Sequence, residues 1–251
     1  MLKDLLSTEV YKNFLLFFVG IFILCNSSLI GDHIDYANDI LQLFVTHFGQ
    51  LYSPKFLSYN VHCLVHLAED AKHHGVLDNF SAFRYVDHLN KMKRLLRKPS
   101  CPLSQIVRRF SEMQNCSQKK ERKNNPPLLR KQHAAGPLPE SFQGASQFKE
   151  IKTSSYTLKL DQANSFVYID GKVAKLQNII SAKDDIYVAY TTFNNHELFF
   201  DYPLPSSALG IHLVDGISGP THFCKFENIE AKAFLVPYDR HFDSVPLLHT
   251  H

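Results

Sequence analysis

The sequence predicts an α+β protein in which an all-helical block is followed by a small antiparallel β barrel or sandwich. Apolar residues recur at helical spacing through the first 113 residues, a basic segment with prolines and glycines follows, and apolar and polar residues alternate from Ser155 onward. With 251 residues, of which 45% are apolar, the chain can bury a sizeable core. We therefore expect a helical region at 1–113, a linker at 114–150 and a β domain at 151–251.

The first helix is expected in an apolar run at 14–25, FLLFFVGIFILC, which lies behind two lysines as in a signal peptide. Asp4 and Glu9, however, lie where a signal peptide carries positive charge. Twelve residues are also too few to cross a hydrocarbon layer of about 30 Å as a helix. Ser7-Thr8-Glu9 is typical of a helix start, so we expect a buried core helix at about 10–24.

The cysteine content bears on localisation. The five cysteines are odd in number, lie far apart and form no C-x-x-C pair, unlike the dense sets of small secreted domains. Such a set favours a reducing compartment. We therefore expect a nuclear or cytoplasmic protein that is not secreted and has no membrane partner.

Two further helical stretches are expected before residue 72. Apolar residues recur at helical spacing from about Ile34 to Tyr52, with Asp32 or Asp35 near the start. Pro54 interrupts the pattern, which resumes from Phe56 to Ala71. Together with the first helix, these stretches would form the helical block.

A basic amphipathic helix follows them. Its apolar positions fall on one side, which we expect to pack: Tyr85, Leu89, Met92, Leu95 and Leu96. Prolines at 99 and 102 then break the helix. Cations held on a packed helix can meet phosphates at a low ordering cost, although they read no base sequence by themselves. The candidate nucleic-acid-binding residues are Lys91, Lys93, Arg94, Arg97, Lys98, Arg108 and Arg109.

The net charge of +3 conceals a strong asymmetry along the chain. Lys and Arg number 4 against 8 Asp and Glu in residues 1–83, 14 against 3 in residues 84–131, and 9 against 13 in residues 132–251. A field of one sign over so short a stretch attracts polyanions such as a phosphate backbone. The alternative is a solvated helix face followed by a basic linker.

The β domain is predicted from a change of period. Apolar residues alternate at Tyr156, Leu158 and Leu160, and Asp170-Gly171 is typical of a tight hairpin turn. Strand-like runs continue to Tyr238. Six or seven short strands separated by turn residues favour a small antiparallel barrel or sandwich.

Several common site motifs are absent from the sequence. It contains no G-x-x-x-x-G-K-[ST], G-x-G-x-x-G, H-E-x-x-H or G-x-S-x-G. P-loop, dinucleotide-binding, zincin metalloprotease and serine-hydrolase functions therefore have no support.

A histidine pair forms a candidate metal half-site. His62 and His66 lie four residues apart on a predicted helix, so their imidazoles share one face and could bind one tetrahedral metal ion. A structural zinc needs two more ligands, and the sequence has neither a C-x-x-C nor a second H-x-x-x-H to supply them. The alternative is that both rings point to solvent or are capped by neighbours such as Glu69 and Asp70.

Three strings occur in the order NVHCLVHLAED at 60–70, GVLDNFSAF at 75–83 and KRLLRKP at 93–99. Together they resemble the C-terminal region of CACTA-type (En/Spm-like) transposases, as found in invertebrate and plant transposable elements. The resemblance runs from about Tyr11 to Arg109. The tail is similar to the downstream segment of the invertebrate members, in FDYP at 200–203, SSALGI at 206–211 and PLLH at 246–249.

This resemblance implies a DDE-type nuclease of RNase H-like fold, which cuts DNA with divalent metal, magnesium, held by three acidic residues. The third acid would be a Glu just after the F-S-A-F word, where this chain has Val86. Asp87 lies beside it, but on a helix it points about 100° away. Asp87 also lies four residues before Lys91, the spacing of a helix-stabilising ion pair. The two upstream acids would precede Met1.

The resemblance also implies a zinc site made from an upstream C-x-x-C and a downstream His pair, which His62 and His66 match. Zinc is therefore expected only together with cysteines outside this sequence, because its affinity depends on the complete ligand set.

The resulting hypothesis is a transposon-derived fragment that is catalytically incomplete and retains nucleic-acid binding through the basic helix, with DNA as its partner. The alternative is a protein-interaction module in which the β domain at 151–251 binds a transposase or a chromatin protein. A third hypothesis, an active nuclease, requires Asp87 to be catalytic and two further acids to be supplied.

Overall fold

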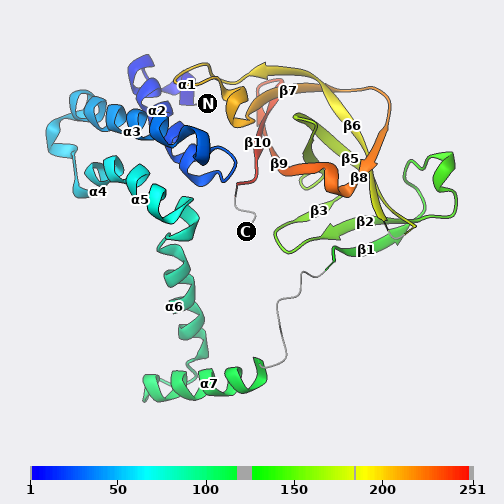
Figure 1. The fold of residues 1–251 in the computed structure, drawn as a ribbon, viewed down its shortest axis with the longest axis horizontal. Helices are drawn as coiled ribbons and strands as arrows, with labels where there is room; N and C mark the ends of the chain where they lie inside the picture. Colours follow the sequence, from blue (N-terminus) through cyan, green and yellow to red (C-terminus); the bar gives the residue numbers. More distant parts are fainter. Residues whose placement is uncertain (1, 118–125, 184, 249–251) are drawn as a thin grey trace.

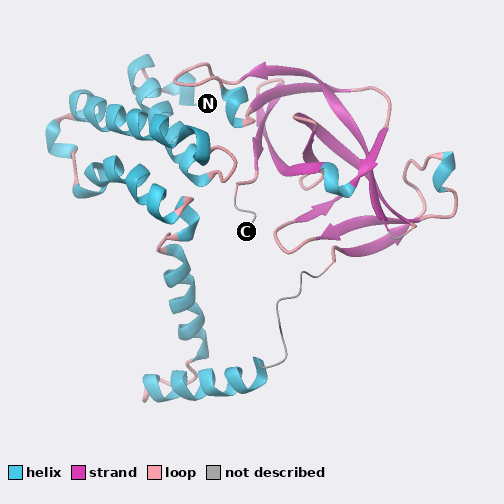
Figure 2. Cartoon of the chain, viewed as in Figure 1, coloured by secondary structure: helices cyan, strands magenta, loops and turns pink. Residues whose placement is uncertain are grey.

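The computed structural model describes residues 2–117, 126–183 and 185–248 (Figure 1). Helices make up the N-terminal part, and an antiparallel sheet makes up the C-terminal part (Figure 2). The predicted α+β class is therefore confirmed. The basic cluster at 119–123 lies outside the described residues.

The helical part begins with a packed pair and ends with two helices that stand away from it (Figure 1). Short 3-10 turns interrupt the chain at Pro54–Phe56 (η1), Cys63–His66 (η2) and Leu77–Asn79 (η3). The α-helices are α1 (Leu2–Leu5), α2 (Thr8–Cys25), α3 (Ile30–Tyr52), α4 (Tyr59–His62), α5 (Leu67–His74), α6 (Phe83–Leu95) and α7 (Pro102–Ser117).

Helices α2 and α3 form the centre of the helical core. Leu16 and Ile23 of α2 are almost fully buried, as is Leu41 of α3. Gly20 permits the close approach of the two helices, because a Cβ atom there would lie 2.8 Å from the Leu41 side chain. Among the described helices, α2 alone is long and apolar enough to cross a membrane by length and composition. In this structure one side of α2 is buried in the helical core.

The sheet is antiparallel throughout, and six of its strands pair in a closed cycle. The cycle runs β5, β4, β9, β10, β7, β6 and returns to β5. Strand β2 adds to β5, β1 and β3 add to β2, and β8 adds to β6. The strands are β1 (Leu128–His133), β2 (Ser146–Lys152), β3 (Thr157–Lys159), β4 (Phe166–Ile169), β5 (Lys172–Ala182), β6 (Asp185–Leu198), β7 (His212–Ile217), β8 (His222–Lys225), β9 (Ile229–Tyr238) and β10 (His241–Pro246).

The hairpin turn predicted between β4 and β5 is confirmed. Asp170 and Gly171 have φ values of +50° and +69°, as a two-residue hairpin turn with both central residues at positive φ requires. Asp and Gly are among the residues that adopt this conformation at the lowest cost.

The sheet begins earlier than the sequence predicts. Strands β1 and β2 start at Leu128 and Ser146, within the range 114–150 expected to be a linker. Strand β1 is mostly polar because it is an edge strand, and Lys131 forms an ion pair of 3.1 Å with Glu150 of β2. A charged edge strand of this kind shows little of the apolar alternation that marks a strand in a sequence.

The loop between β1 and β2 is fixed by a buried amide. Asn178 in β5 is fully buried, and its Nδ2 donates hydrogen bonds to the carbonyl of Pro137 at 2.9 Å and to Oε1 of Gln147 at 2.8 Å. A Cβ atom on Gly136 would lie 2.3 Å from the Asn178 side chain, so only glycine fits there. The Gly-Pro step expected to separate two regions is therefore docked on the sheet.

The connection between β6 and β7 joins the helical part to the sheet. Phe200, Leu209 and Ile211 of this connection are buried in the same apolar core as α2 and α3. The Tyr36 hydroxyl of α3 donates a hydrogen bond of 2.8 Å to the carbonyl of Pro203. The strings FDYP and SSALGI, which carry the resemblance in the tail, thus lie where the two parts meet.

Candidate nucleic-acid interface

The predicted nucleic-acid-binding residues gather on α6, α7 and the turn between them. These residues, 83–117, are called the arm here; they project from the rest of the molecule (Figure 1). Within the arm the two helices contact each other, with the ring of His88 stacked on Phe110 at a centroid distance of 5.8 Å. The arm therefore presents its side chains to solvent on most sides.

The arm brings all seven predicted cations together along one structural unit. Helix α6 carries Lys91, Lys93 and Arg94, the turn carries Arg97 and Lys98, and α7 carries the remaining two. All are exposed except Arg109, whose side chain is 33% exposed. The structure thus places residues spread over 19 positions of the sequence on two adjoining helices and the turn between them.

Three of these cations already have acidic partners. Lys91 Nζ lies 2.5 Å from Asp87 Oδ2, the ion pair that the spacing of these residues predicts. Glu112 pairs with Arg109 at 2.7 Å and with Arg108 at 3.1 Å, and these bonds hold the pKa of its carboxyl below the usual value. Exposed pairs of this kind contribute little to stability, and phosphate can compete for their cations.

The other four cations form no ion pair with an acidic side chain within the described part of the chain: Lys93, Arg94, Arg97 and Lys98. The charge of Arg94 still helps to lower the pKa of Asp87. These four are therefore the residues most available to a phosphate backbone.

Gln105 of α7 fixes the turn that carries two of these four. Its Oε1 accepts hydrogen bonds from the backbone N–H of Arg97 at 3.0 Å and of Lys98 at 3.3 Å. Its Nε2 donates to the carbonyls of Lys98 at 2.9 Å and Ser100 at 2.6 Å. One side chain thus satisfies four backbone groups. Sequence reasoning missed this role, and a glutamine within a helix offers no local sign of it.

The apolar side of α6 does not pack as the sequence predicts. Tyr85 is 73% exposed and Leu89 is 59% exposed. Met92, Leu95 and Leu96 are only partly buried. An amphipathic pattern shows that a face suits burial, but burial also requires an element beside it, and no described element of this chain covers the face.

At the position where the transposase resemblance predicts the third acidic residue, this chain has no carboxylate. Val86 is 51% exposed, and the carboxylate of Asp87 faces Lys91, which lowers its pKa. No group of three or more His, Cys, Asp or Glu side chains in the described ranges could hold a metal ion. The described residues around Asp87 therefore offer no complete set of ligands for a magnesium ion.

The histidine pair keeps its predicted proximity. His62 ends α4 and His66 ends the 3-10 turn η2, so the two do not lie on one continuous α-helix. Their ring centroids are still 5.6 Å apart, and both side chains are exposed. With no third ligand beside them in the part of the chain described, the pair does not fit a zinc site alone.

A family model matches the sheet region of the chain. Residues 132–247 match the family described as a domain of unknown function (DUF8592). The match begins inside β1 and ends just after β10, so it covers the sheet and excludes the arm. No curated protein and no solved structure matches the chain.

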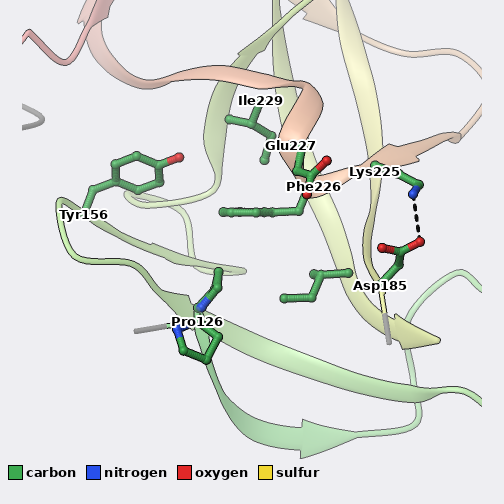
Figure 3. Close-up of a pocket in the computed structure, with 9 residues that line it drawn as sticks. Pro126, Tyr156, Asp185, Lys225, Phe226, Glu227 and Ile229 are labelled. Atoms are coloured by element: carbon green, nitrogen blue, oxygen red, sulfur yellow. Dashed lines mark hydrogen bonds and ion pairs between the residues drawn. The ribbon is translucent and has the colours of Figure 1, made fainter. Parts of the chain in front are cut away.

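A pocket of about 390 Å³ lies between the matched region and the prolines at 126 and 127, just before it (Figure 3). It lies where η6 (Phe226–Asn228) follows the edge strand β8, and an ion pair of 2.7 Å between Lys225 and Asp185 borders it. Burial raises the pKa of the Tyr156 hydroxyl at the opposite side. The apolar lining consists of Pro126, Pro127, Tyr156, Ile186, Phe226 and Ile229.

Proposed function

We propose that this chain is a transposon-derived protein, related to the C-terminal region of CACTA-type transposases, that binds duplex DNA through the arm. The observation that carries the proposal is the set of four exposed cations that form no ion pair among the described residues, on and beside α6. Gln105 holds the backbone of two of them in one conformation, which lowers the entropy lost on binding.

The binding would be directed to the phosphate backbone. The arm presents Lys and Arg side chains, which fix a protein on a duplex but carry no sequence information directly. Arg97 and Lys98 lie in a turn, so their backbone cannot enter the major groove as a continuous helix with α6. We therefore infer a contribution to affinity rather than to the choice of DNA sequence.

The proposal includes no strand cleavage by this chain. In the resembling family, cleavage depends on metal held by three acids. Here Val86 occupies one acidic position, and Asp87 is engaged with Lys91. The helical part would correspond to the C-terminal helices of an RNase H-like core, and the closed cycle of six strands supports a small barrel for the C-terminal part.

A titration of duplex DNA at several salt concentrations tests this function. We expect binding that weakens linearly with salt on logarithmic axes, with a slope of about −0.9 for each phosphate neutralised. Absence of binding at low salt, or binding with no dependence on salt, would contradict the proposal. Magnesium-dependent nicking of the DNA by the purified chain would contradict the absence of cleavage.

A second function is favoured by the pocket in the β domain. The pocket combines an apolar lining with the free edge of β8, which pairs only with β6 in the described sheet. An extended peptide can add to such an edge and place an apolar side chain in such a pocket. On this alternative the partner would be a transposase or a chromatin protein, and charge reversal in the arm would leave its binding intact.

A further inference from the structure

The turn between α6 and α7 carries a serine that directly follows two exposed cations. Ser100 comes three residues after Arg97 and two residues after Lys98. Protein kinases that select basic substrates bind cations on the N-terminal side of the acceptor hydroxyl through complementary charge. Of all the serines and threonines in the sequence, only Ser100 and Ser111 have Lys or Arg at both of these positions. Both lie in the arm.

The structure makes Ser111 the poorer acceptor of the two. It lies within the long helix α7, whose backbone groups bond to one another along the helix. The two cations that precede it, Arg108 and Arg109, both pair with Glu112. A kinase would have to unwind the helix and displace the Glu112 carboxylate to bind this segment.

Ser100, in contrast, is accessible. It is exposed in irregular backbone between the two helices of the arm. Its carbonyl accepts a hydrogen bond of 2.6 Å from Gln105, but no hydrogen bond engages its hydroxyl within the described residues. The bonds that Gln105 makes to this turn are exposed, so water can replace them when a kinase binds the segment in an extended form.

We propose that Ser100 is a phosphorylation site for a basophilic serine kinase and that phosphorylation releases the arm from DNA. The Ser100 Oγ forms a bond to the γ-phosphorus of a nucleoside triphosphate. The bond from that phosphorus to the β,γ-bridging oxygen breaks, the hydroxyl proton passes to the catalytic aspartate of the kinase, and the nucleoside diphosphate leaves. The release rests on the DNA binding proposed above, whereas the modification itself does not.

The new charge would act on the nearest cations of the turn. A phosphoserine carries about −1.5 to −2 charges at neutral pH and three strong acceptor oxygens. The Gln105 amide lies within hydrogen-bond distance of backbone atoms of Arg97, Lys98 and Ser100, so these three residues converge on one point. A phosphate on Ser100 therefore competes with DNA for both cations, at the high effective concentration of an intramolecular group.

The phosphate also suits its place in the fold. Ser100 lies two residues before Pro102, where α7 begins. Negative charge is favourable beside a helix N-terminus, where the first backbone N–H groups have no partner within the helix. Phosphorylation should therefore leave the helices of the arm intact, and a loss of DNA binding would result from charge.

Incubation of the full chain with magnesium ATP and the catalytic subunit of cyclic-AMP-dependent protein kinase tests the site. We expect incorporation of phosphate that mass spectrometry assigns mainly to Ser100. The variant Ser100→Ala should lose most of this incorporation, and the matched control Ser111→Ala should keep it. No incorporation, or incorporation that Ser100→Ala does not reduce, would overturn the site.

Titration of duplex DNA with the unmodified and the phosphorylated chain tests the release. We expect the phosphorylated chain to bind at least about tenfold more weakly, with a salt slope smaller by about two times 0.9, because two cations are withdrawn from DNA phosphates. Treatment with a phosphatase should restore both values, and the far-ultraviolet circular dichroism spectrum should not change.

Equal affinity of the two forms for DNA would overturn the release. Failure of the unmodified chain to bind would refute the proposed DNA binding and the release together. The assignment of Ser100 is measured without DNA, so it depends on phosphate incorporation alone, and the two failures are distinguishable.

Discussion

The side-chain amide of Asn178 donates to the carbonyl of Pro137 at 2.9 Å, and this contact secures the loop between β1 and β2 to the sheet. The same amide donates to Gln147, whose Oε1 also accepts the N–H of Gly136 at 3.0 Å. These buried polar groups depend on one another, since loss of one leaves the others without partners.

Replacement of Asn178 by Ala should therefore destabilise the protein by about 1 to 3 kcal/mol, the cost of leaving buried polar groups unsatisfied. Urea unfolding followed by circular dichroism measures the change. The control Asn90→Ala removes an exposed amide on α6 and should stay within about 0.5 kcal/mol of wild type. Equal effects of the two changes would show that the Asn178 contact has no structural importance.

Gly20 and Gly31 offer a matched pair of helix substitutions. A Cβ atom at Gly20 would lie 2.8 Å from the buried side chain of Leu41, whereas nothing lies within 4 Å of a Cβ atom at Gly31. Gly20→Ala should destabilise the helical core by about 1 to 3 kcal/mol through overpacking. Gly31→Ala should be neutral or stabilise by up to about 1 kcal/mol, since Ala favours the helix. Thermal unfolding of both variants decides whether α2 and α3 pack this closely in solution.

The α+β class could be predicted because both of its signals are local. Helical spacing identifies α3, and Asp170-Gly171 identifies the β4–β5 turn, from neighbouring residues alone. The closure of the strand cycle could not be predicted in this way. It depends on the pairing of β4 with β9, strands separated by 59 residues, and no local pattern specifies such a pair.

In the candidate site, too, only the features with a local sequence pattern could be predicted. The cations of the arm could be found because Lys and Arg are concentrated in a short stretch of the sequence. The exposure of Tyr85 and Leu89 could not, since the pattern of an apolar face is the same whether or not another element covers it. The role of Gln105 was also missed, because its bonds reach backbone groups up to eight residues away.

Two histidines in the sheet should make stability depend on pH. The rings of His196 and His212 lie 5.7 Å apart, and His196 Nε2 accepts a hydrogen bond from the N–H of Val173 at 3.2 Å. Desolvation lowers the pKa of both; the cation of Lys172 adds to this effect at His196, and His196 adds to it at His212. The folded state therefore binds protons less readily than the unfolded state, whose histidines titrate near pH 6.5.

Stability contributed by these neutral rings is present above about pH 6.5 and is lost as the pH falls through the lowered pKa values. Urea midpoints should therefore decrease between pH 7.5 and the onset of carboxylate titration. The double variant His196→Gln, His212→Gln should show a smaller decrease over that range. A decrease of the same size in the variant would assign the effect to other groups.

Charge reversal in the arm distinguishes the two proposed functions. The triple variant Lys93→Glu, Arg94→Glu, Arg97→Glu should abolish most DNA binding and reduce the salt slope by about three times 0.9. Binding of a protein partner to the β domain should be unaffected.

The matched control for charge places the same change on exposed lysines of the sheet, as Lys149→Glu, Lys152→Glu, Lys172→Glu. This variant has the same net charge as the arm variant. Equal loss of DNA binding in the two would mean that only overall charge matters, and the arm would then have no special place in binding.

Gln105 allows the conformation of the turn to be tested without a change in charge. The variant Gln105→Ala removes all four hydrogen bonds that hold the turn at 97–100, while the seven cations remain. The turn would become mobile in the free protein, and ordering it on the DNA would cost free energy, so affinity should fall about three- to tenfold. Because the number of phosphate contacts is unchanged, the salt slope should stay the same.

Gln50→Ala, at an exposed position of α3, serves as the control. If Gln105→Ala changed the slope as well as the affinity, the turn would determine how many cations reach the DNA; if it changed neither, the ordering of the turn would have no part in binding.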